Sequence, residues 1–347
     1  MRPARPEESP ESTNARQSPH WQAELARGYR DPAELLRALS LTPDACGLAA
    51  SGVLAFPLRV PRGFVARMRP GDPRDPLLLQ VLPASRETEA APGFIADPVG
   101  DLASARSPGL LQKYAGRALL ITTGACAVHC RYCFRREYPY AGASAAGDHL
   151  EQALQSIADD PSLREVILSG GDPLVLGEQR LEFLLGFLDN VPHVERVRIH
   201  TRVPVVLPER VDARLLDLLD RQRQRVVVVV HANHPREIDT KVATAFRSLG
   251  EVTAALLNQS VLLRGINDAP EVLADLSSAL FAAGVLPYYL HQLDPVSGAA
   301  HFAVTDEQAV AILRTVTALL PGYLVPRLAR ETAGASAKTL LGPFGAT

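Results

Sequence analysis

The chain has 347 residues, 47% of them hydrophobic, and a formal net charge of -2. A charge so near zero is typical neither of a general nucleic-acid-binding surface nor of a trap for acidic ligands, so we expect small-molecule partners. Four cysteines, three of them clustered, do not make a secreted disulfide framework and indicate a reducing cytoplasm. We expect neither a signal peptide nor a membrane span, because the first residues show no apolar h-region and no apolar run reaches the ~18 residues that a spanning helix needs.

The N-terminal part of the chain is predicted to wrap a larger body. Residues 1–18 are rich in Pro, Glu, Ser and Arg, and we expect a disordered tail because they bury too little apolar surface to offset the entropy of ordering. Residues 19–107 are punctuated by prolines and are predicted as an N-terminal accessory region. Within it, the apolar spacing of DPAELLRALSL indicates a helix with Asp31 as its N-cap ahead of Pro32.

Residues 108–347 alternate short β-branched or apolar runs with stretches of helical spacing. Six runs predict strands: ALLITT, EVILSG, RVRIHT, RVVVVVHA, AALLNQSVLL and LPYYLHQL. Segments with apolar residues at i, i+3 and i+4 follow these runs, and a seventh extended stretch, GYLVPRLARE, follows the last helix. This alternation predicts right-handed βαβ units on a parallel sheet.

Chemically reactive residues follow one predicted strand after another. They are the three clustered cysteines and, after the later strands, Asp172, Arg202, His231, Gln259, Asp294 and Glu331. A barrel lets many strands contribute to a shared site at its carboxyl-terminal rim, whereas a doubly wound sheet concentrates its site at one switch point. We therefore predict an α/β fold with a partial (β/α)6 TIM-like barrel, incomplete because six repeats and one strand fall short of eight.

The most specific motif is C-x3-C-x2-C, formed by Cys126, Cys130 and Cys133 on a loop after the first predicted strand. Thiolates suit zinc and iron-sulfur clusters. A structural zinc site takes four ligands, and the nearest candidates for the fourth are His129 and His149. Three cysteines on a four-iron cluster would instead leave one iron open to an exogenous molecule, and we favour this interpretation over zinc or a redox dithiol.

With an aromatic residue before its last cysteine, CAVHCRYC resembles the motif of the radical S-adenosylmethionine (SAM) superfamily. CRYCFRR together with LSGGDPL resembles its lysine 2,3-aminomutase branch, and the likeness runs from about Trp21 to Lys338. The sequence is most similar to the bacterial members that make (R)-β-lysine for the modification of elongation factor P. Stretches that carry this likeness include ALLITTGACAVHCRYCFRREYPY, RIHTRVPVVLPERV and PYYLHQLDPVSGAAHF.

The resemblance implies that the three cysteines hold a 4Fe-4S cluster whose open iron chelates SAM. An electron from the reduced cluster would cleave SAM to methionine and a 5'-deoxyadenosyl radical, while the protein binds, orients and protects. Gly170, Gly171 and Asp172 match a strand end that contacts the methionine part, since glycines permit close approach and a carboxylate suits the ammonium. Further cofactor contacts are matched by Arg202, His231 and Gln259.

The resemblance also implies pyridoxal 5'-phosphate (PLP), joined as an imine to Lys338 in ETAGASAKTLLG. The family tends to have a glycine-rich run before this lysine, whereas only Gly334 and small residues stand here, so we expect a stiffer loop. Without the resemblance, Lys338 would be interpreted as a solvated surface charge. Lys113, Tyr114 and Arg117 match positions that handle the cofactor phosphate, a role that suits cationic groups.

Three charged residues match the substrate-binding positions of the family. Arg135 matches the residue that binds the substrate carboxylate, and its neighbour Arg136 is a control because only one of the two is expected to point inward. Asp294 and Glu331 match two acidic positions that hold the remote ammonium of lysine. Acidic residues at both places disfavour a glutamate substrate. The family's lysine enzymes commonly have aspartate where Glu331 stands.

The activity that the resemblance implies is an isomerase, a radical SAM and PLP-dependent lysine 2,3-aminomutase that converts (S)-α-lysine to (R)-β-lysine for elongation factor P. Expected partners are L-lysine, an electron donor such as flavodoxin and, functionally, an elongation factor P ligase. Neither nucleic acid nor membrane is expected as a partner, and we expect a cytoplasmic location. Two alternatives stay open: a catabolic or osmolyte-producing lysine 2,3-aminomutase, and a non-catalytic zinc-binding scaffold.

Overall fold

Ten strands form one sheet in the computed structural model, which describes residues 20–48, 56–145 and 148–342. The strands lie side by side in their chain order, and the described part of the sheet is open because β1 and β10 are its two ends. The seven central strands run parallel. They are β3 (Arg117–Thr123), β4 (Glu165–Gly170), β5 (Arg196–Thr201), β6 (Arg225–Val230), β7 (Ala255–Val261), β8 (Leu286–His291) and β9 (Arg327–Arg330). The partial barrel predicted from the sequence is confirmed.

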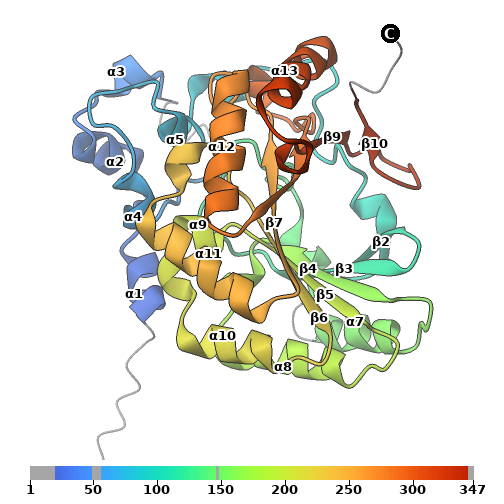
Figure 1. Ribbon diagram of the computed structural model, residues 1–347. Helices are drawn as coiled ribbons and strands as arrows, with labels where there is room; N and C mark the ends of the chain where they lie inside the picture. The colour runs from blue at the N-terminus through green and yellow to red at the C-terminus, as the bar shows by residue number, and fades with distance from the viewer. Residues whose placement is uncertain (1–19, 49–55, 146–147, 343–347) are drawn as a thin grey trace, which may run out of the picture.

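Helices follow the parallel strands and lie around the outside of the curved sheet (Figure 1). They are α7 (Asp148–Ala158), α8 (Glu178–Asp189), α10 (Ala213–Asp220), α11 (Thr240–Val252), α12 (Pro270–Ala282) and α13 (Asp306–Leu319). In α8, buried leucines recur at 181, 184, 185 and 188, the spacing that places one apolar stripe against the sheet. None of the helices in the described ranges is both long enough and apolar enough to cross a bilayer.

Short helical turns complete the loops at the barrel ends. They are α6 (Tyr140–Ala143), α9 (Val203–Val206), η3 (Pro173–Val175), η4 (Pro208–Arg210), η5 (Pro235–Glu237), η6 (Ala300–Phe302) and η7 (Gly322–Leu324). Several of these turns begin at or next to a proline, whose missing N–H group and restricted φ suit the first turn of a helix.

The accessory region consists of short helices that pack on the barrel. They are α1 (His20–Ala26), α2 (Pro32–Ala38), α3 (Pro43–Cys46), α4 (Arg62–Val65), α5 (Pro76–Leu79), η1 (Ser85–Thr88) and η2 (Leu102–Ser104). Asp31 caps α2 by accepting a hydrogen bond from the N–H of Ala33, as predicted. Trp21, Phe64 and Leu77 are buried in the same hydrophobic cluster as the barrel strands. The domain boundary at residue 107 stays a prediction, and the predicted tail at 1–18 lies outside the described residues.

The two ends of the sheet differ from the sequence prediction. The antiparallel strands β1 (Ala105–Ser107), β2 (Leu110–Tyr114) and β10 (Thr339–Leu340) were not predicted, because short edge strands carry little periodic signal. The stretch 322–331, predicted as one extended segment, divides into η7 and β9 around Pro326. Proline cannot donate a ladder hydrogen bond, so β9 begins only after it.

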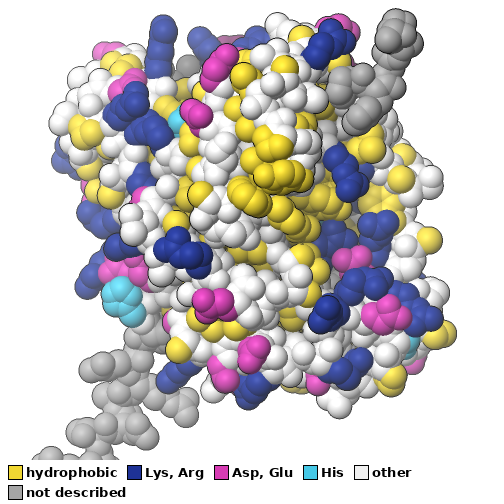
Figure 2. Space-filling view, in the orientation of Figure 1, with side chains coloured by type: hydrophobic (Ala, Val, Ile, Leu, Met, Phe, Trp, Pro, Cys, Tyr) yellow, Lys and Arg dark blue, Asp and Glu magenta, His cyan; other side chains and the backbone are white. Residues whose placement is uncertain are grey.

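Exposed hydrophobic side chains gather over α12 and the chain beside it (Figure 2). Large exposed residues there include Phe281 at the end of α12, Leu286 at the start of β8 and Tyr323 in η7. The rings of Phe281 and Tyr323 lie 5.5 Å apart. Because Leu286 opens β8, this group lies at the amino-terminal end of that strand, away from the rim that carries the reactive residues.

Candidate active site

The carboxyl ends of the parallel strands bring most of the predicted site residues to one rim. The residues that end or follow successive strands are Gly170 and Asp172 after β4, Arg202 after β5, His231 after β6, Asp294 after β8 and Glu331 after β9. Gln259 lies on β7, and the cysteine loop follows β3. Side chains that are more than 200 residues apart in the chain therefore come into direct contact, as the 2.8 Å hydrogen bond from Tyr114 to Glu331 shows.

The cysteine loop is seated by the glycines at the end of β4. The N–H of Gly171 donates to the carbonyl of Thr123 at 2.7 Å, and the N–H of Asp172 donates to the carbonyl of Ala125 at 2.8 Å. A Cβ on Gly171 would lie 2.1 Å from the carbonyl oxygen of Ala125, and Gly170 has a φ of 114°. Only glycine permits this approach of two backbones. A contact between these glycines and SAM stays a prediction.

The Asp172 carboxylate also has a structural role that the sequence does not indicate, which is to bind the loop after β5. Its buried carboxylate accepts hydrogen bonds from the hydroxyl of Thr201 at 2.7 Å and from the N–H groups of Arg202, Val203 and Leu174. Burial raises its pKa to about 6 against the lowering effect of these donors. The carboxylate thus fastens the loop after β5 to the end of β4, and an incoming ammonium group would have to share it with four donors.

The three thiols of the loop are half-buried. Burial, and secondarily the neighbouring thiols and Asp172, raise the pKa of Cys126 well above its usual value. Burial and Cys130 raise the pKa of Cys133 to about 11. No three His, Cys, Asp or Glu side chains within the described ranges lie close enough to hold a single metal ion. A four-iron cluster needs no such grouping because each thiolate binds a separate iron, so the donor set fits a cluster.

His231 and Gln259, both predicted as SAM contacts, lie against each other, and their contact with SAM stays a prediction. The side-chain amide of Gln259 lies 2.8 Å from Nε2 of His231. Burial and the nearby guanidinium groups of Arg202 and Arg135 lower the pKa of His231 to about 3, so its imidazole is neutral at physiological pH. The ring of His200, on β5, lies 6.0 Å from that of His231. These neutral rings can bind a ligand by hydrogen bonding or stacking without adding charge.

The structure separates the two neighbouring arginines. Nε of Arg135 donates to Asp101 at 2.6 Å, and its Nη1 donates to the hydroxyl of Ser169, a residue of β4, at 3.1 Å. Arg136 turns to the accessory region, where its Nη2 donates to Glu87 at 2.6 Å. Arg135 is therefore the inward residue of the pair. A bond from Arg135 to a substrate carboxylate stays a prediction.

Glu331 is surrounded by predicted cofactor residues. It forms an ion pair with Lys338, accepts a hydrogen bond from the hydroxyl of Tyr114 at 2.8 Å, and lies 3.5 Å from Nζ of Lys113. Burial opposes ionisation of Glu331, but Lys338 and Lys113 outweigh it and lower its pKa. Lys338 is held in this place because it directly precedes β10, which pairs with β9 next to Glu331.

Asp294 differs from Glu331 in having no ion-pair partner within the described residues. Burial raises the pKa of Asp294 to about 7, with Glu331 adding to this effect and Lys338 opposing it. The two predicted ammonium-binding carboxylates are thus near each other but unequal. In this structure Glu331 is ionised and paired, whereas Asp294 titrates near neutrality.

The residues predicted for the PLP phosphate lie on the β2–β3 hairpin. Lys113 and Tyr114 end β2, and Arg117 begins β3 with its guanidinium carbon 5.1 Å from the centre of the Tyr114 ring. Within the part of the chain that the structure describes, no carboxylate forms an ion pair with Arg117. A guanidinium without an ion-pair partner, beside a lysine and a tyrosine, suits the phosphate of a cofactor. Glu331 contacts both Tyr114 and Lys338, so a lysine amine that could bind the aldehyde of the same cofactor lies nearby.

Sequence reasoning missed several buried residues of the site. Asp101 joins Arg135 to Lys113, whose Nζ lies 2.7 Å from its carboxylate, yet it lies in the proline-rich accessory region without a motif. Gln80 and Glu237 are fully buried and contact Arg202. His200 could have been predicted, because it stands near the carboxyl end of β5, as the other reactive residues stand at or after the ends of their strands.

Comparisons with known proteins show which family the chain is similar to. The radical SAM superfamily profile matches residues 120–272. An L-lysine 2,3-aminomutase of Escherichia coli (strain K12) is 48% identical over 322 residues, covering 92% of this chain and 94% of that one. An L-lysine 2,3-aminomutase of Haemophilus influenzae is 44% identical over 331 residues, covering 95% and 98%. A solved radical SAM methyltransferase from Sphaerobacter thermophilus is 18% identical with a TM-score of 0.45, covering 64% of this chain and 68% of that chain.

Radical SAM proteins use a 4Fe-4S cluster and SAM, so this membership implies both cofactors. The Escherichia coli and Haemophilus influenzae relatives match over more than nine tenths of each chain and carry the name of one isomerase, an aminomutase that acts on L-lysine. The chain belongs to the radical SAM L-lysine 2,3-aminomutase family.

Proposed function

We propose that this protein is a PLP-dependent lysine 2,3-aminomutase that converts (S)-α-lysine to (R)-β-lysine for the modification of elongation factor P. The observation that carries the proposal is the charge pattern of the rim. An inward guanidinium, Arg135, is joined to Glu331 through Asp101 and Lys113. A second carboxylate, Asp294, lies close enough to Glu331 and Lys338 for their charges to act on its pKa. L-lysine carries the complementary groups, a carboxylate and an ammonium at the far end of its side chain.

Cys126, Cys130 and Cys133 are the proposed cluster ligands. They stand on the loop that Gly171 holds against β4, where all three side chains are half-buried. Arg202, His231, Gln259 and the Gly170–Asp172 turn are the proposed cofactor contacts on the SAM side of the site. Their backbone and neutral side-chain groups can orient a zwitterionic ligand without competing with it for the open iron.

Lys338 is the proposed PLP-binding lysine, and Lys113, Tyr114 and Arg117 are the proposed phosphate contacts. When bound, PLP would stabilise the unpaired electron while the amino group moves, and SAM with the reduced cluster would supply the radical that starts the reaction. The chain's own contribution is to hold Lys338 beside Glu331, so that the amine that binds the cofactor and the carboxylate that binds the substrate stand together. Attack by Lys338 on the cofactor requires its neutral amine.

The link to elongation factor P rests on the sequence stretches that resemble that branch of the family. It predicts functional coupling to an elongation factor P ligase and electron supply by a donor such as flavodoxin. We place the reaction in the cytoplasm, where cysteine thiols stay reduced and available to a cluster.

Anaerobic reconstitution with iron, sulfide, SAM and PLP tests the proposal. The expected result is a protein that binds about three to four irons, shows PLP absorption that is lost in Lys338→Ala, and converts labelled L-lysine to (R)-β-lysine. Arg136→Lys is a control outside the proposed lysine contacts. The (S) product would support a catabolic or osmolyte role instead. Stoichiometric zinc without iron would overturn the proposal in favour of a scaffold.

A further inference from the structure

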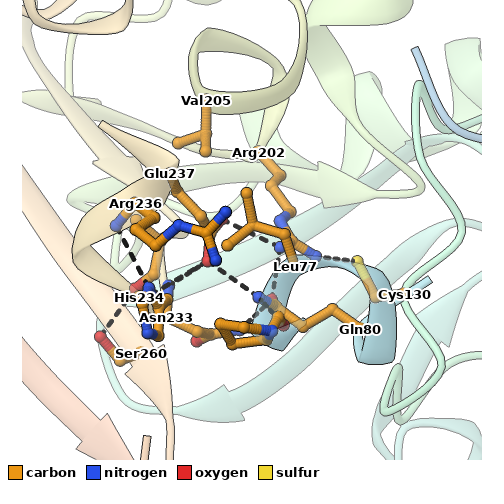
Figure 3. Close-up of polar contacts among 12 residues, drawn as sticks. Leu77, Gln80, Cys130, Arg202, Val205, Asn233, His234, Arg236, Glu237 and Ser260 are labelled. Carbon is orange, nitrogen blue, oxygen red and sulfur yellow. Dashed lines mark hydrogen bonds and ion pairs between the residues drawn. The ribbon is translucent and has the colours of Figure 1, made fainter. Parts of the chain in front are cut away.

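A buried polar network around Arg202 contacts Cys130, one of the three motif cysteines (Figure 3). Nη1 of Arg202 lies 2.8 Å from Sγ of Cys130. Nη2 of the same guanidinium donates to Oε1 of Gln80 at 2.6 Å and to Oε2 of Glu237 at 3.0 Å. Gln80 and Glu237 have no exposed surface, and Arg202 is 5% exposed. One side of the guanidinium therefore faces sulfur, and the other faces fixed acceptors.

The partners of Arg202 are themselves held in place. Oε1 of Glu237 accepts hydrogen bonds from the N–H groups of Asn233 and His234 at 2.9 and 3.1 Å and from the amide of Gln80 at 3.1 Å. The N–H of Arg202 donates to Asp172 at 2.7 Å. The network thus connects the accessory region, through Gln80, to the loops after β5 and β6. A guanidinium anchored at its backbone and at its far end has little freedom to leave the sulfur.

The contact distinguishes Cys130 from its neighbour in the motif. Cys133 receives a hydrogen bond from the backbone N–H of Arg135, a neutral donor. Cys130 receives one from a cation, and a charge-assisted hydrogen bond is roughly twice as strong as a neutral one. Hydrogen bonds to ligand sulfurs and nearby charge are the levers by which a protein sets the reduction potential of an iron-sulfur cluster.

We propose that Arg202 is a positioning residue for the cluster, and that its guanidinium, held by Gln80 and Glu237, makes the cluster easier to reduce by donating to the Cys130 sulfur. The inference rests on the proposed function, in which Cys130 is a cluster ligand. Reduction adds one electron from the external donor to the cluster, and no bond at Arg202 is made or broken. A fixed cation beside a ligand sulfur stabilises the added negative charge.

The test is the midpoint potential of the cluster in the anaerobically reconstituted holoenzyme, measured without SAM by a redox titration that follows the EPR signal of the reduced cluster. Arg202→Gln is expected to keep its iron and to show a reduction equilibrium constant at least tenfold lower, a midpoint ~59 mV more negative for one electron. Arg202→Lys keeps the positive charge but cannot contact Cys130 and the two acceptors with separate nitrogens. The midpoint potential of this variant is therefore expected between those of the wild type and Arg202→Gln.

Arg236→Gln is the matched control. Arg236 belongs to the same polar region, where it contacts Asp75 and the carbonyl of Arg67 and not a cysteine. In Arg236→Gln, the equilibrium constant for reduction of the cluster is expected to change by less than twofold from that of the wild type. A purely structural role for Arg202 predicts lost iron with an unchanged midpoint in the clusters that remain.

The outcomes separate the two proposals. Wild-type protein without iron would overturn the proposed function itself. Wild-type protein with a reducible cluster, together with an iron-loaded Arg202→Gln variant whose midpoint is unchanged, would overturn only the role of Arg202. If Arg202→Gln does not load iron, Gln80→Leu decides, because it removes one anchor and leaves Arg202 in place. A negative shift smaller than that expected for Arg202→Gln supports the inference, and an unshifted midpoint rejects it.

Discussion

On the side of the rim that carries the cysteines, the buried guanidinium of Arg202 is bound by acceptors that are themselves fixed by hydrogen bonds. On the side that carries Lys338, cations and carboxylates form ion pairs that share partners. We call the first the cluster side, comprising Gln80, the three motif cysteines, Arg202 and Glu237. The second is the lysine side, comprising Asp101, Lys113, Arg135, Asp294, Glu331 and Lys338. On the cluster side, Glu237, an acceptor of Arg202, also receives two backbone hydrogen bonds. On the lysine side, each cation pairs with a carboxylate that has further cationic partners.

The difference teaches how the two kinds of ligand are accommodated. A resident cluster needs surroundings that do not move, and a buried network that fixes both Nη atoms of Arg202 supplies them. A substrate that binds and leaves needs charges that can exchange partners. A carboxylate that reaches Arg135 competes with Asp101, and an ammonium that reaches Glu331 competes with Lys338. Four changes test this comparison, in order of decreasing expected effect.

Cys130→Ala tests the cluster side most directly. Loss of one of three thiolates is expected to abolish cluster binding and SAM cleavage, because the remaining two sulfurs cannot hold the cluster against solvent. Iron content and 5'-deoxyadenosine formation under reducing conditions measure the effect. Cys46→Ala, on α3 and outside the motif, is the control and is expected to keep both. A Cys130→Ala variant that still forms 5'-deoxyadenosine would remove this residue from the ligand set.

Gly171→Ala tests whether the seat of the cysteine loop is as rigid as the contacts indicate. The added methyl would lie 2.1 Å from the carbonyl oxygen of Ala125, so the loop has to shift, and we expect iron loading to fall severalfold. Gly186→Ala is the control, since that glycine lies in α8 with nothing within 4 Å of the new methyl. Its expected effect is a gain of about 0.5–1 kcal/mol in the free energy of unfolding. Equal iron loading in both variants would contradict a rigid seat.

Asp101→Asn breaks the central pair of the lysine side. It leaves the buried Arg135 guanidinium and Lys113 without their shared carboxylate, and we expect a loss of about 3–5 kcal/mol in the free energy of unfolding. Urea unfolding of the cofactor-free protein measures it. Asp217→Asn removes one carboxylate of an exposed pair with Arg221 and should change the same quantity by less than about 1 kcal/mol. Similar losses in both would show that the Asp101 pairs are not structural.

The pH dependence of lysine binding sharpens the contrast between Asp294 and Glu331. Because burial raises the pKa of Asp294 to about 7, its carboxyl is neutral at pH 6 and ionised at pH 8. Lysine affinity, measured by titration calorimetry on PLP-loaded protein, is expected to rise up to about tenfold per pH unit below 7 and to level off above it. In Asp294→Asn this rise should disappear. A rise that persists would assign the dependence to another group.

The same raised pKa predicts a stability effect of opposite sign. The folded protein binds the Asp294 proton more tightly than the unfolded chain does, so this group contributes stability below the unfolded pKa that is lost as pH rises toward about 7. Asp294→Asn removes that loss. The Tm of the variant relative to the wild type is expected to be higher at pH 8 than at pH 4, which thermal unfolding at the two values measures.

Much of the barrel and part of the site could be predicted from local sequence. The β-branched runs such as RVVVVV and the helical spacing of segments such as RLEFLLGFL persist in the structure as β6 and α8, because a parallel strand covered on both faces must be apolar throughout. The rule that reactive residues follow such strands then placed Arg202, His231 and Asp294 on one rim. The structure of the accessory region could not be predicted in the same way, because most of its helices are too short to show an apolar periodicity and Asp101 belongs to no motif.

The sequence by itself determined the alternating architecture, the trio of thiols and the two carboxylates Asp294 and Glu331 of the lysine side. Only the tertiary structure decided the partners: that Arg202 faces Gln80, 122 residues away, and Cys130, that Arg135 and not Arg136 points inward, and that Lys338 is paired with Glu331. The reason is physical. Apolar periodicity acts between neighbours in the chain, whereas a buried charge must find its partner wherever the folded backbone brings one within reach.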